Sequence, residues 1–311
     1  MELNENADLD TSQVEDARGA GGGGGRGFGL PIPMGGGGGG MIITIVVVVI
    51  GLLVGGGTFG RSLLGGGGDD SGQGNNTTLE QKCDKSNPDR FKDADCRNLL
   101  YVNSIQAYWQ TTLPETFGKP YQKAPTHYFS SAVSTACGQA DSGVGPFYCP
   151  ADDKVYIDLA FYDELSSRFG AKGQFAQPYV LAHEYGHHVQ DLLGTEAQMR
   201  RAQQRDPNNA NQYSVMLELQ ADCYAGVWTN HATETRSAQG QALFTSVTPQ
   251  DVREALDAAA AVGDDAIQKK MGGGVDESKF THGSSDDRQK WFNQGYNSGD
   301  ARTCDTFGRG V

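Results

Sequence analysis

The sequence is poor in basic residues. Its 311 residues include 25 Lys and Arg against 38 Asp and Glu, which gives a formal net charge of −13. Nucleic-acid phosphates and anionic lipid surfaces both attract a basic face, so this balance argues against either as a partner. We attribute the acidity to solubility. The sequence also lacks an internal repeat, a P-loop and a dinucleotide-binding fingerprint.

Cysteines are few and lie only in the later part of the chain. All six follow residue 82, and no two of them form a C-x-x-C pair, which argues against a zinc site built from cysteines. An even number suits disulfides in an oxidising compartment. Many pairings are possible, and joining sequence neighbours gives Cys83–Cys96, Cys137–Cys149 and Cys223–Cys304 as our prediction.

The N-terminal quarter differs in composition from the rest. Residues 1–40 are acidic at first and then contain glycine runs, so we predict a disordered, glycine-rich cytoplasmic tail. Residues 41–60 carry no charge and are long enough to cross a bilayer core of about 30 Å. We predict a transmembrane anchor there. The alternative is a secretory signal peptide, but such a segment normally lies close to the N-terminus.

These features predict the domain organisation. Residues 61–78 form a flexible linker, and residues 79–311 form the globular domain. Because every cysteine lies after the apolar run, we expect a single-pass membrane protein whose domain faces the cell surface or periplasm. The sequence gives no indication of oligomeric state.

The globular domain has mainly helical periodicity. Apolar spacing predicts helices at residues 98–109, 161–169, 174–193, 213–228, 251–261 and 285–296, with Gly194 ending the third of them. Alternation at residues 154–159 predicts a strand. An extended peptide can add to a free strand edge, so this strand is a candidate substrate-binding edge. An ordinary structural strand is an equally good interpretation.

The helix at 174–193 contains an H-E-x-x-H motif formed by His183, Glu184 and His187. Side chains four residues apart lie on one helix face, where two imidazoles can share one Zn²⁺ ion. Glu184 projects about 100° away from His183 and can act as a general base on water at the metal. The motif therefore predicts a zinc site, with one ion per chain.

A second polar pair occurs 31 residues after His187. Glu218 and Asp222 are again four residues apart in a predicted helix. Glu218 can supply a third zinc ligand, and Asp222 can accept a hydrogen bond from the free N–H of a ligating histidine. The alternative is two amphipathic helices with incidental polar faces. Buried helices have little other reason to carry such residues.

The sequence resembles the bacterial neutral zinc metallopeptidase family over residues 98–305. The shared segments are GPFYCP at 145–150, VYIDL at 155–159, HEYGHHVQ at 183–190, ELQAD at 218–222 and THGS at 281–284. The resemblance implies an α-rich α+β, zincin-like domain with a small sheet beside the H-E-x-x-H helix. It also implies His183, His187 and Glu218 as zinc ligands, Glu184 as the catalytic base and Asp222 as the carboxylate behind the ligands.

The other histidines have different predicted roles. His282 opens the last helix after the glycine loop at 271–275 and resembles the histidine segment of prenyl-protease-like membrane peptidases, so it is our candidate for stabilising the oxyanion. His231 is the alternative. His188 faces away from His187 and is expected to pack or to support the ligands, and His127 has no assigned role.

The predicted function is zinc-dependent hydrolysis of a peptide bond in an extracytoplasmic protein or peptide. Two other classes stay open. One is a non-catalytic zinc module that binds partners at the cell surface, although an intact Glu184 argues against it. The other is a metal-free interaction protein in which His183 and His187 are structural.

Overall fold

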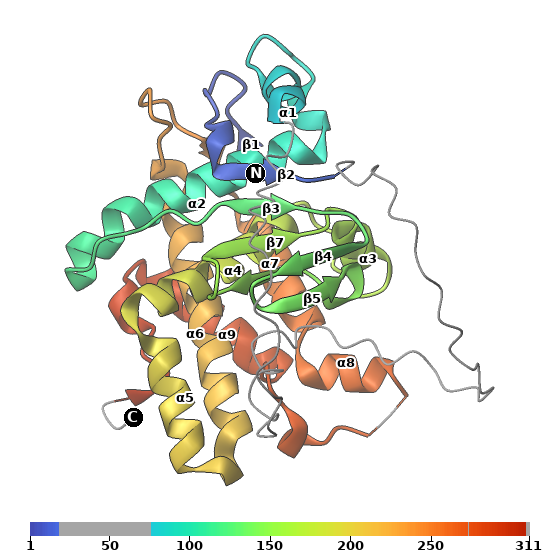
Figure 1. The fold of residues 1–311 in the computed structure, drawn as a ribbon, viewed down its shortest axis with the longest axis vertical. Coiled ribbons are helices and arrows are strands. Elements are labelled where there is room, and N and C mark those ends of the chain that lie inside the picture. The colour runs from blue at the N-terminus through green and yellow to red at the C-terminus, as the bar shows by residue number, and fades with distance from the viewer. Residues whose placement is uncertain (19–75, 273, 309–311) are drawn as a thin grey trace, which may run out of the picture.

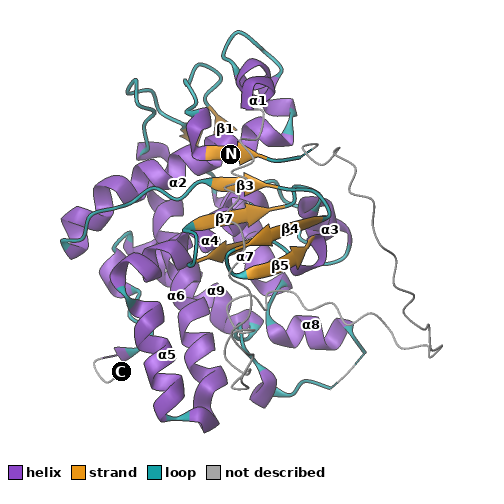
Figure 2. Ribbon diagram, viewed as in Figure 1, coloured by secondary structure: helices purple, strands orange, loops and turns teal. Residues whose placement is uncertain are grey.

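The computed structural model describes residues 1–18, 76–272 and 274–308, and it shows short strands surrounded by helices (Figures 1 and 2). This is the predicted α-rich α+β class. The strands are β1 (Glu2–Leu3), β2 (Val14–Asp16), β3 (Thr126–Tyr128), β4 (Ala132–Thr135), β5 (Gly138–Asp141), β6 (Phe147–Cys149), β7 (Lys154–Ile157) and β8 (Phe244–Ser246). The helices are α1 (Asn76–Cys83), α2 (Ala94–Phe117), α3 (Phe161–Ser167), α4 (Ala176–Leu193), α5 (Thr195–Arg205), α6 (Ala210–His231), α7 (Pro249–Ala261), α8 (Asp264–Lys270) and α9 (Ser285–Ser298).

The main sheet has four strands in the order β2-β3-β7-β6. β3 pairs in parallel with β2 and with β7, whereas β6 and β7 are antiparallel. β6 is buried along its length and contacts α4, the helix that carries the H-E-x-x-H motif. The sheet edge nearest that helix is therefore β6.

The prediction of a substrate-binding edge at residues 154–159 is wrong. β7 lies inside the sheet, with β3 on one side and β6 on the other. Both rows of its backbone groups face neighbouring strands, so β7 offers no free edge to a peptide. The ordinary structural interpretation of this strand is the correct one.

Helix α6 packs against both α4 and α9, and α4 and α6 carry all the predicted site residues except His282. Two glycines allow α6 and α9 to approach closely. A Cβ atom at Gly226 would lie 2.0 Å from the carbonyl oxygen of Phe292, and one at Gly295 would lie 1.9 Å from that of Cys223. Any larger residue would push the two helices apart. Gly194 ends α4 with φ of 78°, as predicted.

Residues 1–18 fold onto the domain, so the prediction of a disordered tail is wrong for them. β2 adds a parallel strand to β3, and β1 pairs with β8. Asp10 and Asn103 exchange two hydrogen bonds between side chain and backbone, at 2.7 and 3.0 Å. Ala7 and Val14 are fully buried. Composition could not predict this order, because partners distant in the sequence supply it.

The remaining N-terminal predictions concern residues outside the described part of the chain. These are the rest of the tail at 19–40, the anchor at 41–60 and the linker as far as residue 75. α1 begins inside the predicted linker, at Asn76. Within the described residues, no helix has the length and apolar character needed to cross a bilayer.

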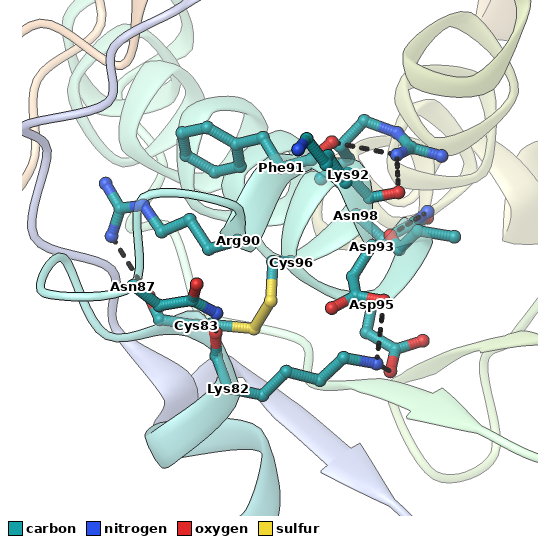
Figure 3. Close-up of a disulfide and its surroundings, with 12 residues drawn as sticks. Lys82, Cys83, Asn87, Arg90, Phe91, Lys92, Asp93, Asp95, Cys96 and Asn98 are labelled. Carbon is teal, nitrogen blue, oxygen red and sulfur yellow. Dashed lines mark hydrogen bonds and ion pairs between the residues drawn. A yellow bond between two sulfur atoms is a disulfide. The ribbon is translucent and has the colours of Figure 1, made fainter.

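All three predicted disulfides are formed. Cys83–Cys96 joins α1 to α2 (Figure 3), Cys137–Cys149 joins the β4–β5 turn to β6, and Cys223–Cys304 ties the C-terminal segment to α6. The first bond lies beside the hydrogen bonds of Arg90, and the third lies beside that of Gln220; both sets are described below.

Arg90 lies beside the Cys83–Cys96 disulfide (Figure 3) and holds the N-terminal segment to this corner of the fold. Its buried guanidinium donates hydrogen bonds to the carbonyl oxygens of Cys83, Glu5 and Ala7, at 3.0, 3.0 and 2.7 Å. Hydrogen bonds from a charged donor are stronger than neutral ones. One cation therefore satisfies carbonyl groups from two segments far apart in the sequence.

We expect Arg90→Met to lower the free energy of unfolding by about 2–4 kcal/mol, because it leaves these carbonyl groups without a donor. Urea denaturation of the two proteins measures the difference. The control is Arg253→Met, since Arg253 is exposed and hydrogen-bonds only Gln250. We expect the control to change the free energy by less than about 0.5 kcal/mol. Equal effects of the two substitutions would contradict the structural role of Arg90.

Candidate metal centre

The two motif histidines and Glu218 meet in one place. His183 and His187 project from α4, and Glu218 projects from α6, with each residue 6 % exposed. His183 Nε2 lies 3.2 Å from His187 Nε2 and 3.2 Å from Glu218 Oε2. His187 Nε2 lies 3.5 Å from Glu218 Oε1. The structure therefore brings together the three residues predicted as ligands.

These separations fit a zinc ion. Nitrogen and oxygen ligands about 2.1 Å from a tetrahedral zinc ion lie roughly 3.4 Å from one another. The three measured separations of 3.2, 3.2 and 3.5 Å bracket that value. Two imidazoles and one carboxylate are also a donor set that zinc accepts, with one position left for water. The residues are thus arranged to hold one metal ion.

Asp222 supports the first ligand, as its spacing from Glu218 predicted. Its Oδ1 atom lies 2.8 Å from His183 Nδ1 and also accepts a hydrogen bond from the Tyr179 hydroxyl at 2.6 Å. Arg288 of α9 donates to both carboxylate oxygens of Asp222, at 2.8 and 3.0 Å. With Nδ1 fixed in this way, His183 presents Nε2 toward the other ligands.

His187 has a different support. Its Nδ1 atom lies 2.9 Å from Gln190 Oε1, one turn further along α4. The Gln190 amide in turn donates to the carbonyl oxygen of Leu217 and to Gln220 on α6, at 2.7 and 3.1 Å. Both ligating rings are therefore oriented by hydrogen bonds from their outer nitrogen atoms.

Electrostatics keep the carboxylates of the centre ionised. Burial alone would raise the pKa of Glu218, but the neighbouring His187 and His183 outweigh it and hold that pKa well below its usual range. Burial also opposes ionisation of Asp222, yet Arg288 and His183 lower its pKa to about 2. Anionic carboxylates are the form that coordinates a metal and orients a histidine.

The pKa of Glu184 is shifted in the opposite direction, above its usual range. Burial raises its pKa to about 7, and the nearby Glu218 adds to the rise while His183 opposes it. Glu184 lines the same pocket as His183 and Glu218. A carboxylate whose pKa lies near neutrality can both accept and release a proton, which is the requirement for a general base.

His282 lines this pocket as well. Its Nδ1 atom lies 3.1 Å from Asp264 Oδ1, and Asp264 Oδ2 accepts the backbone N–H groups of Thr281, His282 and Gly283 at 2.7, 2.7 and 3.0 Å. His282 Nε2 is buried and has no hydrogen-bond partner among the described residues. An unpartnered buried nitrogen is costly, which points to a partner that arrives from outside.

The remaining histidines lie elsewhere. His231 bonds Glu234 and the carbonyl oxygen of Gly299, so of the two predicted oxyanion donors only His282 reaches the pocket. His188 is buried between the Tyr148 hydroxyl and the carbonyl oxygen of Gln122, a packing role. His127 of β3 contacts Glu15 of the neighbouring strand β2, with Nδ1 and Oε2 3.1 Å apart.

Sequence reasoning missed several residues of the site: Tyr179, Gln190, Asp264 and Arg288. Gln190 could have been found, because it follows His187 by three residues on the same helix and so lies one turn away. Asp264 and Arg288 gave no such signal. Each lies far along the chain from its partner and reaches it only through packing of α8 and α9.

Comparison with known proteins agrees with this geometry. A family described as "Putative neutral zinc metallopeptidase" matches residues 4–307, which include β2 as well as the site. The uncharacterized protein YpfJ of Escherichia coli K12 is 47 % identical over 198 residues, or 63 % of this chain and 66 % of that protein, slightly less than two thirds of its length. The uncharacterized protein Rv2575 of Mycobacterium tuberculosis H37Rv is 44 % identical over 225 residues, covering 72 % and 74 % of the two chains. No solved structure matches the chain.

We expect the purified protein to bind one zinc ion per chain and to lose it in His187→Ala and Glu218→Ala, because each change removes one of three ligands. Metal analysis after dialysis measures the content. A matched control is a His–Glu pair outside the pocket, His231 and Glu234, whose Nδ1 and Oε2 atoms lie 2.7 Å apart. Alanine at either control position should leave the zinc content unchanged. Zinc retained in Glu218→Ala would contradict the assignment of the third ligand.

Proposed function

The chain belongs to the neutral zinc metallopeptidase family, and from that premise we propose that it hydrolyses peptide bonds in a protein or peptide substrate. One observation carries the proposal. The pocket lined by two of the three ligand side chains, His183 and Glu218, is also lined by Glu184, with a pKa near 7, and by His282, whose Nε2 atom has no partner among the described residues. A site that only stored a metal has no use for either group.

Each residue has a proposed part in the reaction. His183, His187 and Glu218 would hold the ion, and zinc when bound supplies a Lewis acid that acidifies water and polarises a carbonyl group. Glu184 accepts the proton of the attacking water and returns it to the leaving amine. Burial lowers the pKa of His282, but Asp264 and Glu218 raise it overall. The protonated ring donates from Nδ1 to Asp264 and from Nε2 to the oxygen of the scissile carbonyl as negative charge develops there.

We also propose that the domain works outside the cytoplasm. Three disulfides within the described residues favour an oxidising compartment. Residues 1–18 complete the same sheet as residues 126–157, so they must share that compartment. This pairing supports an extracytoplasmic position for them, in place of the cytoplasmic one predicted with a single span at 41–60.

The reaction is tested on the full-length, zinc-loaded protein with a broad peptide library. We expect Glu184→Gln to lower kcat by at least about 10²-fold while the zinc content is unchanged, because the amide cannot accept the proton. The exposed Glu115 on α2 provides the control, and Glu115→Gln should behave as wild type. Zinc without hydrolysis in the wild type would favour the non-catalytic binding module. A wild type without zinc would return the histidines to a structural role.

His282 has a separate test. We expect His282→Phe to lower kcat by about 10²–10³-fold with little change in KM, because the lost hydrogen bond strengthens only in the transition state. His231→Phe is the matched control and should keep wild-type kinetics. A fall in zinc content, or an equal loss in both variants, would contradict the proposed role of His282.

A further inference from the structure

The pocket at the metal centre has apolar as well as polar lining residues. The polar residues are those already described, including Arg288. The apolar residues, called the apolar wall below, come from five segments: Pro146, Phe161, Val180, Val262 and Ile267. The proposed reaction uses none of these five residues, so their position beside the centre needs another explanation.

The apolar wall is built next to the metal ligands. Val180 precedes His183 by one helical turn, so both side chains lie on the same face of α4. Phe161 opens α3, and its ring packs so closely on Gly145 that a Cβ atom there would lie 3.3 Å from the ring. Both Phe161 and Val180 are buried, whereas Val262 and Ile267 are half-buried. The wall is therefore fixed at its base and exposed at its rim.

Apart from Glu184 and the Nε2 atom of His282, which the proposed reaction uses, the charged groups at this pocket have partners among the described residues. Arg288 is paired with Asp222 and also donates to the carbonyl oxygen of Val262 at 3.4 Å. His282 is held by Asp264, and Glu218 faces the two ligating histidines. A charged substrate side chain placed against the apolar wall would lose its hydration without gaining a counter-charge. An apolar side chain would instead gain by leaving water.

We infer that this apolar wall forms a specificity pocket, which binds an apolar side chain of a residue that flanks the scissile bond. The inference rests on the proposed peptidase function. It defines the substrate class as peptides with leucine, phenylalanine or a similar residue beside the cleaved bond. Val180 and Ile267 are specificity-determining residues, and neither takes part in proton transfer.

Binding tests the pocket without requiring turnover. Amino-acid hydroxamates share a zinc-binding group and differ only in their side chains, so their relative affinity for the zinc-loaded protein reports on the pocket. We expect leucine hydroxamate to bind about 10-fold or more tightly than glycine hydroxamate. Aspartate and lysine hydroxamates should bind no more tightly than glycine hydroxamate. Isothermal titration calorimetry measures all four.

Two matched variants test whether the preference for leucine hydroxamate arises in this pocket. Ile267→Asp places a charge at the rim of the pocket and should abolish the preference for leucine while leaving the affinity for glycine hydroxamate unchanged. Val275→Asp introduces the same charge at an exposed valine outside the pocket and should preserve the preference. Equal affinities for leucine and glycine hydroxamates, or an unchanged preference in Ile267→Asp, would overturn the inference.

Peptide cleavage then separates the two proposals. Two peptide series vary one residue before or after the scissile bond among Gly, Leu, Phe, Asp and Lys. We expect kcat/KM in one series to be about 10-fold or more higher for Leu and Phe than for the others. Cleavage without this preference would overturn the specificity pocket and leave the peptidase intact. Leucine-selective binding with no cleavage would support the pocket and reject the peptidase function.

Discussion

The buried charge of Asp222 is the constraint on which the rest of the site depends. This carboxylate is fully buried on α6, and an ionised group can stay in such a place only when it is paired and hydrogen-bonded. Arg288 from α9 and His183 from α4 satisfy it together. One carboxylate therefore fixes the relative positions of three helices and sets the orientation of a ligating histidine.

Close helix packing makes that network possible. α6 and α9 touch through Gly226 and Gly295, which have no Cβ atoms to separate the backbones. The disulfide Cys223–Cys304 begins at the residue after Asp222, and the Gln220 side chain donates to the carbonyl oxygen of Cys304 at 2.8 Å. The C-terminal segment is thus tied to the helix that carries Glu218 and Asp222. A rigid support of this kind suits a metal site, whose ligands tolerate little displacement.

The pocket combines this rigid polar base with an apolar wall that is half-buried at its rim. Glu184 lines the same pocket, and burial rather than a specific partner is the main cause of its raised pKa. The same exclusion of water would strengthen the hydrogen bond that His282 offers. The proposed chemistry and specificity therefore depend on the same packing of α3, α4, α6, α8 and α9 around one cavity.

The sequence by itself determined the features that depend on short-range spacing. Residues four apart lie on one helix face wherever the helix is placed, so spacing alone groups His183 with His187, and Glu218 with Asp222. Pairing of neighbouring cysteines and the C-cap at Gly194 were predictable for similar local reasons. The predominance of helices followed from periodicity.

Only the tertiary structure decided the contacts between distant segments. Arg288 and Asp264 reach the site through helix packing that no local pattern encodes, and the choice of His282 over His231 required their positions in space. The order of residues 1–18 depends on Arg90, Asn103 and the free edge of β3, all remote in the sequence. The interior position of β7 likewise depends on which strands pair with it, because alternation specifies a strand but not its neighbours.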